Sequence, residues 1–164
     1  MGFEVTRMKM LAPQFTQPGL AGIGSSSIDP QVQQLAVVPL TAAQITTLHT
    51  VPVTVIAAPG AGKAIVVEQA VLEFKFGTVA FTGGGVVTLI YHGGSTALHS
   101  GSVPASVITA ASGTSATEVG PQTGANGLTL AVNAGVDISA ATANFAAGDG
   151  TAQLWIWYTV ANLS

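Results

Sequence analysis

The sequence predicts an all-β protein, a jelly-roll-like antiparallel β-sandwich of about eight strands with an extended N-terminal arm and one short helix. Three observations predict this class. Short apolar, β-branched runs alternate with Gly-rich turns from residue 51 to residue 162, as in strands joined by tight connections. No amphipathic helix of about 10–15 residues alternates with these runs, which argues against a parallel α/β fold. The 164 residues are 48% hydrophobic, enough to form the core of one domain.

The first 40 residues form the predicted arm, and residues 41–164 form the predicted sandwich domain. "PQFTQPGLAGIGSSSIDPQVQQ" mixes Pro, Gly, Ser and Gln with single hydrophobic residues, so alone it cannot offset its ordering entropy. It is nevertheless too apolar for a solvated linker. We interpret it as an arm that becomes ordered against a neighbouring subunit; packing on its own domain is the alternative. The residues that carry this interpretation are Phe3, Phe15, Leu20, Ile23, Ile28, Leu35 and Val37.

A short helix is predicted in "PLTAAQITTLHTVPV". Thr41 followed by Gln44 fits a capping box, and Leu40 with Ile45 fits the accompanying hydrophobic staple. The helix should end before Pro52, because the residue before a proline disfavours helical geometry.

The predicted strands follow one another through the rest of the chain. "AIVVEQAVLEFKFG" contains the clearest alternation, and Asn133-Ala134-Gly135 is a predicted turn between two strands. Asp149-Gly150 is interpreted as a type I′ turn before the last strand. The other strand candidates are "VPVTVIAA", "GVVTLIYHG", "TALHS", "ASVITA", "GLTLAVN", "VDISAAT" and "TAQLWIWYTVAN".

"APGAGKA", at residues 58–64, superficially resembles a phosphate-binding loop. That loop requires Gly at position 57, Ser or Thr at position 64, and then a helix. Both positions hold alanine, and the residues that follow are β-branched. Pro59 to Lys63 is therefore predicted to be a turn between strands, with Lys63 in solvent.

The sequence holds few groups suited to catalysis or metal binding, and we expect neither an enzyme nor a bound cofactor. There is no cysteine, and no Gly-x-Ser-x-Gly motif is present. His92 and His99 lie in or beside neighbouring predicted strands, but no third metal ligand is evident. We interpret them as polar residues at a strand edge or subunit contact. A hydrolase with a dispersed Ser-His-Asp site is a minor alternative.

Charge and hydropathy also exclude two classes of partner. Only 7% of residues are charged and the net charge is −3, which provides no basic surface for nucleic acid. The mean hydropathy is +0.56, yet Gly, Pro, Thr, Ser or a charge interrupts each apolar run before the roughly 20 residues that a spanning helix requires. We expect no nucleic-acid or membrane partner, and we expect other protein chains to cover much of this weakly charged surface.

The last strand gives the most informative functional signal. In "QLWIWYTV", Leu154, Ile156, Tyr158 and Val160 share one face, and Trp155, Trp157 and Thr159 share the other. A sandwich buries only one face of each sheet within the domain. The second apolar face is covered either by the arm or a loop, or by another chain. Aromatic residues are enriched at protein interfaces, so we predict that Trp155 and Trp157 contact another subunit in a homo-oligomer, most simply a trimer.

The segment from Leu40 to Gly84 resembles a recurring pattern in tailed-bacteriophage virion proteins. The pattern is a short helix, "L-x-T-x-P-V-x-V/L-I/V-x-A-P-G-A-G-K", and then a strand pair with aromatic alternation. The C-terminal "AQLWIWYTVAN" recurs as well. These proteins are similar to head decoration, or cement, proteins with trimeric jelly-roll domains.

The resemblance implies a virion location on the capsid surface, where the oligomer binds the major capsid protein and stabilises the shell. It brings no catalytic residues with it. It implies that Trp155 and Trp157, with arm residues Phe3, Phe15, Leu20 and Ile23, form oligomer or capsid contacts. The alternative function is a phage tail or fibre β-domain that binds host glycan, because Trp155, Trp157 and Gln153 could form a sugar site.

Overall fold

The computed structural model describes residues 32–98, 102–119 and 129–163. The arm residues Phe3, Phe15, Leu20 and Ile23 lie outside these ranges, as does His99. The predictions made for them therefore stay predictions.

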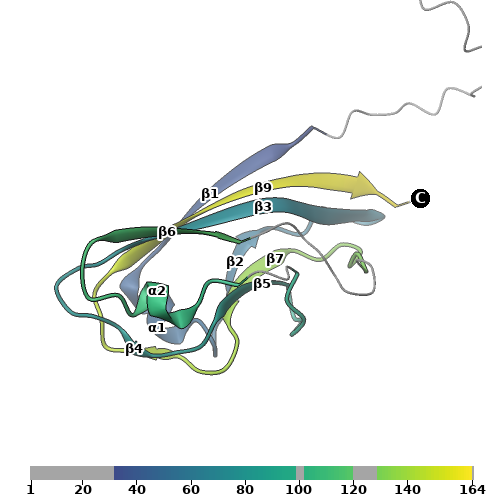
Figure 1. The fold of residues 1–164 in the computed structure, drawn as a ribbon. Coiled ribbons are helices and arrows are strands. Elements are labelled where there is room, and N and C mark those ends of the chain that lie inside the picture. The colour runs from purple at the N-terminus through teal and green to yellow at the C-terminus, as the bar shows by residue number, and fades with distance from the viewer. Residues whose placement is uncertain (1–31, 99–101, 120–128, 164) are drawn as a thin grey trace, which may run out of the picture. The chain divides into compact units, whose positions relative to one another are not determined.

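Two antiparallel sheets face each other in the described part of the chain (Figure 1). The larger sheet has the order β1-β9-β3-β6, and the smaller has the order β2-β7-β5. The bounds of the larger sheet are β1 Gln34–Leu40, β9 Thr151–Asn162, β3 Lys63–Lys75 and β6 Thr114–Val119. Those of the smaller are β2 Val53–Ile56, β7 Val136–Ala140 and β5 Val87–Tyr91.

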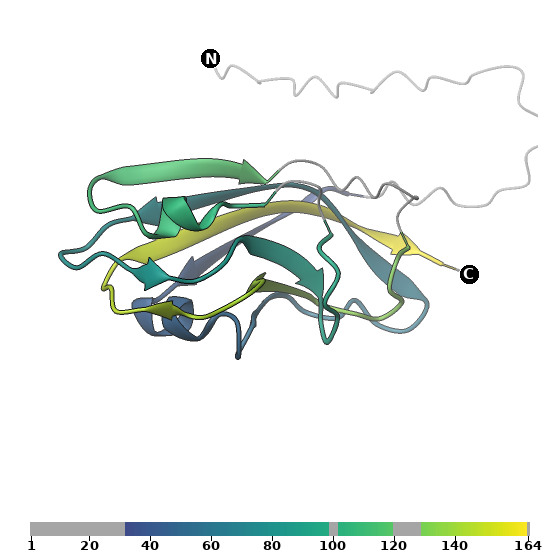
Figure 2. The same ribbon diagram turned by 60° about the horizontal axis from the view of Figure 1, so that its bottom comes forward.

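The remaining elements lie at one end of the sandwich. They are the helices α1 (Ala42–Thr47) and α2 (Ala105–Ile108) and a small strand pair, β4 (Thr82–Gly83) with β8 (Phe145–Ala146). Figure 2 shows that the C-terminal end of β9 lies at the opposite end.

The strand pairing has the nested order of a jelly roll, and it confirms the predicted fold class. β1 pairs with β9, β2 with β7, and β3 with β6. In the stretch of sequence between β3 and β6, single β-bridges join β5 to Ala97 and Val103. The chain is thus folded as a long hairpin wrapped around the core, which is how a jelly roll distributes neighbouring strands over two sheets.

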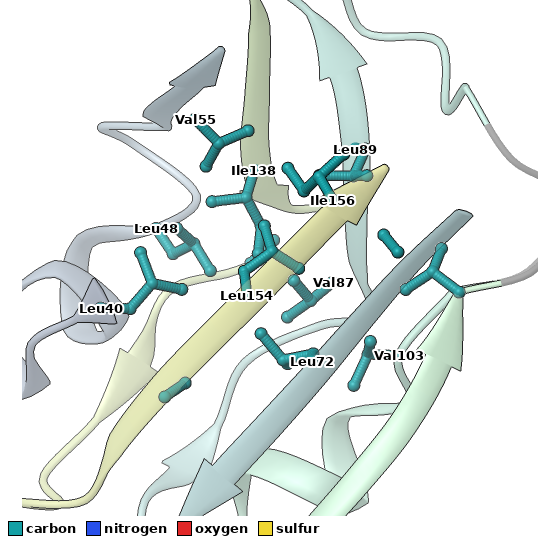
Figure 3. Close-up of a cluster of buried hydrophobic side chains, with 14 of the residues drawn as sticks. Leu40, Leu48, Val55, Leu72, Val87, Leu89, Val103, Ile138, Leu154 and Ile156 are labelled. Atoms are coloured by element: carbon teal, nitrogen blue, oxygen red, sulfur yellow. The ribbon is translucent and has the colours of Figure 1, made fainter. Parts of the chain in front are cut away.

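The core fills the space between the two sheets. Leu72, Leu154 and Ile156 of the larger sheet point toward Val87, Leu89 and Ile138 of the smaller one (Figure 3), and all six are at most 2% exposed. The Tyr91 hydroxyl also donates to the Ile65 carbonyl oxygen at 2.7 Å, which joins the two sheets directly.

A β-bulge in β3 keeps its long apolar pattern directed at the core. Val67 lies opposite Tyr158 and Gln69 lies opposite Trp157, so Glu68 is the extra residue. Before the bulge Ile65 and Val67 are buried, and after it the buried positions change parity to Ala70, Leu72 and Phe74. A bulge that shifts the register by one residue restores the inward face after a break in alternation.

Three phenylalanines close the helical end of the sandwich. The ring of Phe81 lies edge-on to the rings of Phe74 and Phe145, with centroid distances of 6.0 and 6.3 Å. Glycines line this cluster: a Cβ at Gly84 would overlap the Phe145 ring, and a Cβ at Gly148 would overlap the Phe81 ring. Both glycines also have positive φ angles, +76° and +84°.

Helix α1 forms as predicted. The Thr41 hydroxyl accepts from the Gln44 N–H at 3.3 Å, and the Gln44 side chain accepts from the Thr41 N–H at 2.9 Å, which completes the capping box. Leu40 and Ile45 are both buried. The Asn144 side chain then holds the chain after the helix, where its oxygen accepts from the N–H groups of His49 and Thr50.

Two strands of the larger sheet lie where the sequence predicted none, as do the two-residue strands β4 and β8. Gln34–Leu40, assigned to the arm, is β1 and pairs along its whole length with β9. Thr114–Val119 is β6, an edge strand whose inward residues Ser115, Thr117 and Val119 are mostly polar. A weakly apolar edge strand gives little hydrophobic signal, because only one of its faces contacts the core.

Other local predictions were wrong. "ASVITA" contains helix α2 rather than a strand, and its first turn follows the N-cap residue Pro104. In "GLTLAVN" and "TALHS" the described residues form only single bridges, at Val132 and Ala97.

The turn before β9 is also misplaced in the prediction. Positive φ angles fall on Ala147 (54°) and Gly148 (84°), two residues before the expected Asp149-Gly150. Asp149 is held elsewhere, because its side chain is bonded to another loop.

Candidate interaction surface

The outer face of the larger sheet brings both tryptophans together with apolar residues of β1 and β3. Trp155 lies opposite Val37 on β1 and Val71 on β3. Trp157 lies opposite Leu35 on β1. Directly opposed residues in an antiparallel pair share a face. We call these five residues, Leu35, Val37, Val71, Trp155 and Trp157, the tryptophan face.

The tryptophan face is partly open to solvent. Leu35 is 52% exposed and Val37 is 44% exposed, and the two tryptophans are half-buried. The other face of β9 lies on the core, where Leu154 and Ile156 are buried and Tyr158 packs against the cluster. The two-faced pattern predicted for the last strand is therefore present, and the tryptophans lie on the outer side.

Carboxylates border the tryptophan face. Glu118 lies opposite Val71, and Glu73 follows Val71 on the same side of β3. The Gln69 side chain donates to Glu118 at 2.8 Å, and the Gln33 side chain donates to Glu68 at the bulge. The apolar residues are therefore flanked by acidic groups held in place by glutamines.

A shallow pocket of about 340 Å³ lies beside the tryptophan face, toward the helical end. Glu73, Lys75 and Gln153 contribute a carboxylate, an ammonium and an amide to it. Gln153 lies directly opposite both Pro39 and Glu73, two residues along β9 from Trp155. The pocket therefore adjoins the aromatic row on the same side of the sheet.

His92 is paired with a buried carboxylate. Its Nδ1 lies 2.8 Å from Oδ2 of Asp137, which is 3% exposed. A neutral ring would donate from Nδ1, leaving Nε2 as an acceptor. Thr54, His92 and Asn133 line a cavity of about 380 Å³, and sequence reasoning missed this pairing because Asp137 is 45 residues away.

Groups of three or more potential metal ligands do not occur in the part of the chain that the structure describes. The dyad of His92 and Asp137 therefore does not extend to a metal centre there. Within the same residues, no helix is long and apolar enough to cross a membrane.

The segment from Pro59 to Lys63 is a turn between β2 and β3, as predicted. Gly60 and Gly62 have φ angles of +100° and +69°, and the Lys63 N–H donates to the Gly60 carbonyl at 3.3 Å. The Asn133 side chain accepts from the Gly60 N–H at 3.0 Å, and Lys63 is exposed. The glycines serve the turn because they adopt positive φ without strain.

Asp149 fastens the loop before β9 to the loop after β3. Its carboxylate accepts from the Thr78 hydroxyl and from the N–H groups of Val79 and Thr78, at 2.8 and 2.7 Å for the two N–H groups. These hydrogen bonds, with the Thr78 hydroxyl as the largest contributor, hold the pKa of Asp149 below its ordinary value. Gly77 permits this approach, because a Cβ there would overlap the carboxylate.

Comparisons with known proteins identify no family. No family model matches the chain, and no curated protein matches it. Among solved structures, the cyanophage Pam1 capsid asymmetric unit matches with a TM-score of 0.46 and 17% identity. The match covers 96% of this chain and 96% of that chain. A likeness of this size assigns neither a family nor a function.

Proposed function

We propose that this protein is a structural component of a phage virion, a decoration or cement protein. In this role it binds the outside of the capsid as a homo-oligomer and stabilises the shell. The observation that carries the proposal is the tryptophan face, an apolar outer surface on a domain whose core is already complete between its two sheets.

Self-association explains this surface physically. Partly exposed aromatic and branched residues on a flat sheet lose contact with water when a second chain covers them, and this is favourable by about 25 cal/mol per Å² of apolar area. Tryptophan is among the residues most enriched in interface centres. With only 7% charged residues, the surface offers little electrostatic repulsion between copies.

The assignment to a capsid is supported by the resemblance of Leu40–Gly84 to virion proteins. In the structure that segment contains the last residue of β1, then α1, β2, β3 and β4, and the Pro59–Lys63 turn joins β2 to β3. A shell protein acts through many equivalent contacts, so modest affinity at each copy accumulates by avidity. A rigid sandwich with an apolar outer face suits this role.

The first test is the mass of the purified full chain in solution, measured by light scattering. We expect a trimer, and we expect Trp155→Thr with Trp157→Thr to yield monomers that keep the wild-type circular dichroism. Val79→Thr is the matched control, because Val79 is 53% exposed but lies in the loop after β3. A monomeric wild-type chain at all concentrations would contradict the proposal.

The second test is binding to empty phage capsids assembled from the major capsid protein alone. Decorated capsids should resist heat or osmotic shock better than bare ones, and cryo-electron microscopy should show density for the protein at equivalent surface positions. Absence of such density on every capsid tried would leave the shell role unsupported.

A second candidate function is glycan binding, which the pocket beside Trp155 favours. Glu73, Lys75 and Gln153 offer acceptors and donors with no net charge, the composition that suits a neutral polyhydroxyl ligand next to an aromatic ring. The chain's two tryptophans both lie on this side, so their fluorescence reports binding. Soluble bacterial oligosaccharides should then quench the tryptophan fluorescence saturably, and Gln153→Ala and Glu73→Ala should abolish the quenching. That result would favour glycan binding over the shell role.

A further inference from the structure

We propose that the tryptophan face of one copy is covered by residues 1–31 of a second copy. This inference rests on the proposed self-assembly and specifies which surfaces meet. It names a segment of the same chain as the occupant of the face, in place of a second sandwich packed sheet against sheet.

The apolar content of the segment fits the face. From residue 13 to residue 31 the larger hydrophobic side chains occur singly among Gly, Pro, Ser and Gln, and residues 1–12 add Phe3, Val5, Met8, Met10 and Leu11. So short a segment with few hydrophobic residues cannot form a core of its own. The tryptophan face is a patch of five apolar side chains on three neighbouring strands, two each from β1 and β9 and one from β3. An extended segment whose hydrophobic side chains contact the face one after another matches such a surface.

The charges of the two surfaces are complementary. Two of the four basic residues of the chain, Arg7 and Lys9, lie in the segment. Glu73 and Glu118 border the tryptophan face, and no ion pair joins Glu73 to its neighbour Lys75 in the described residues. Each sandwich therefore presents carboxylates beside the apolar row to which a basic segment can bind.

The spacing of these charges also matches. Glu73 and Glu118 are diagonal neighbours on adjacent strands, a relationship that places Cα atoms about 7–8 Å apart. Residues two apart in an extended chain lie on the same side and about 6.6 Å apart. An extended segment therefore presents Arg7 and Lys9 at the separation of the two glutamates, with Phe3 and Val5 on the same side.

The length of the segment places a second copy within its reach. Val32 is the first described residue and lies two residues before β1, at the end of the sheet where Leu35 lies. Arg7 lies 25 positions before Val32, a distance of about 80 Å along an extended chain. The 13-residue strand β3 is about 43 Å long. When extended, the segment is therefore long enough to place Arg7 beyond its own sheet, on a neighbouring copy.

Cross-linking between two different chains tests this placement, because the native sequence has no cysteine. One full-length chain carries Met8→Cys, between the two basic residues. The other carries Ala116→Cys, an exposed position opposite Glu73. Ala61→Cys is the matched control, an exposed alanine in the turn between β2 and β3. A long bismaleimide is added to each mixture, and mass spectrometry identifies the linked peptides.

We expect several-fold more cross-linked product with Ala116→Cys than with Ala61→Cys. Adding Arg7→Glu and Lys9→Glu to the Met8→Cys chain should reduce the yield to the control level. Reversing both partners, with Glu73→Lys and Glu118→Lys on the other chain, should restore it. For two exposed pairs the loss corresponds to about tenfold in the association constant.

The possible outcomes separate this inference from the proposed function. Equal yields with both positions, in a chain that is oligomeric by light scattering, would overturn the inference and leave self-assembly standing. Linkage found only within one chain that carries both Met8→Cys and Ala116→Cys, and independent of dilution, would overturn the second-copy placement. A monomeric full chain with no product between chains would overturn both proposals.

Discussion

Two groups of aromatic residues in this protein have opposite surroundings. Phe74, Phe81 and Phe145 lie within the domain, at most 2% exposed, and glycines close in around them. Trp155 and Trp157 lie on the outer face of the larger sheet and stay half-buried. Aromatic rings are equally effective in cores and at interfaces, so their burial in the isolated chain indicates which purpose each group serves. The phenylalanines stabilise the fold, and the tryptophans remain available to a partner.

The largest effect on folding is expected from Phe81→Ala. Phe81 contacts the rings of both other phenylalanines, and truncating a buried Phe removes apolar burial and leaves a cavity. The cost should be about 3–5 kcal/mol in the free energy of unfolding, measured by urea denaturation. A loss below about 1 kcal/mol would show that the cluster collapses around the vacancy or is less tightly packed than the structure has it.

A slightly smaller loss in the free energy of unfolding is expected from Gly148→Ala. Compared with a control glycine, this variant distinguishes the cost of crowding the ring from the cost of backbone strain. Gly148 has a φ of +84°, and a Cβ there overlaps the Phe81 ring. Strain and overpacking together should cost about 2–4 kcal/mol. Gly113→Ala is the control, since its φ is +76° with nothing within 4 Å of the added Cβ. It should cost only about 1–2 kcal/mol, and equal losses would mean that the Phe81 contact contributes nothing.

The phenylalanine cluster at the helical end of the sandwich shows why part of the fold could not be predicted from the sequence. The capping box at Thr41 and the alternation in β3 are local patterns, and both formed as predicted. The glycines at 84 and 148 are required by rings distant in the sequence. Asp149, read as a turn residue, bonds to Thr78 and Val79 some 70 residues away. Helix α2 likewise overrides the β-branched residues Val107 and Ile108, because tertiary context decides where local propensity is weak.

The pH dependence of stability tests the Asp149 fastening. Hydrogen bonds lower its folded pKa, so Asp149 stabilises the fold above the unfolded carboxyl pKa of about 4. That contribution is lost as the pH falls from there through the folded pKa. Asp149→Asn should therefore lower the thermal midpoint at pH 7, and the difference from wild type should shrink at more acidic pH.

Thr78→Ala removes the hydroxyl that donates to the same carboxylate. Its effect should not add to that of Asp149→Asn in the double variant, because both changes break one shared network. Full additivity, or a difference between Asp149→Asn and wild type that stays constant down to acidic pH, would contradict this account.

For the tryptophan face, the sequence predicted which side of β9 the tryptophans occupy, but it did not predict which residues of other strands lie beside them. The alternation in "QLWIWYTV" placed Trp155 and Trp157 on the outer side correctly. It did not place Leu35 and Val37 beside them, since β1 lay hidden in a segment that resembles an unstructured arm. Strand pairing between residues more than 100 positions apart has no local signature. The acidic border has none either, because Glu73 and Glu118 are brought together only by the pairing of β3 with β6.

The smallest effect on folding, with a large effect on assembly, is expected from Leu35→Thr combined with Val37→Thr. Both side chains are more than two-fifths exposed, and threonine keeps the β-propensity of the strand, so each change should alter the free energy of unfolding by at most about 0.5 kcal/mol. Association should nevertheless weaken, because these residues complete the apolar surface around the tryptophans. Light scattering at matched concentrations measures this directly. The double variant could instead lose unfolding free energy and association in the same proportion as Phe81→Ala does. The tryptophan face would then be part of the folded core, and the distinction between the two aromatic groups would not hold.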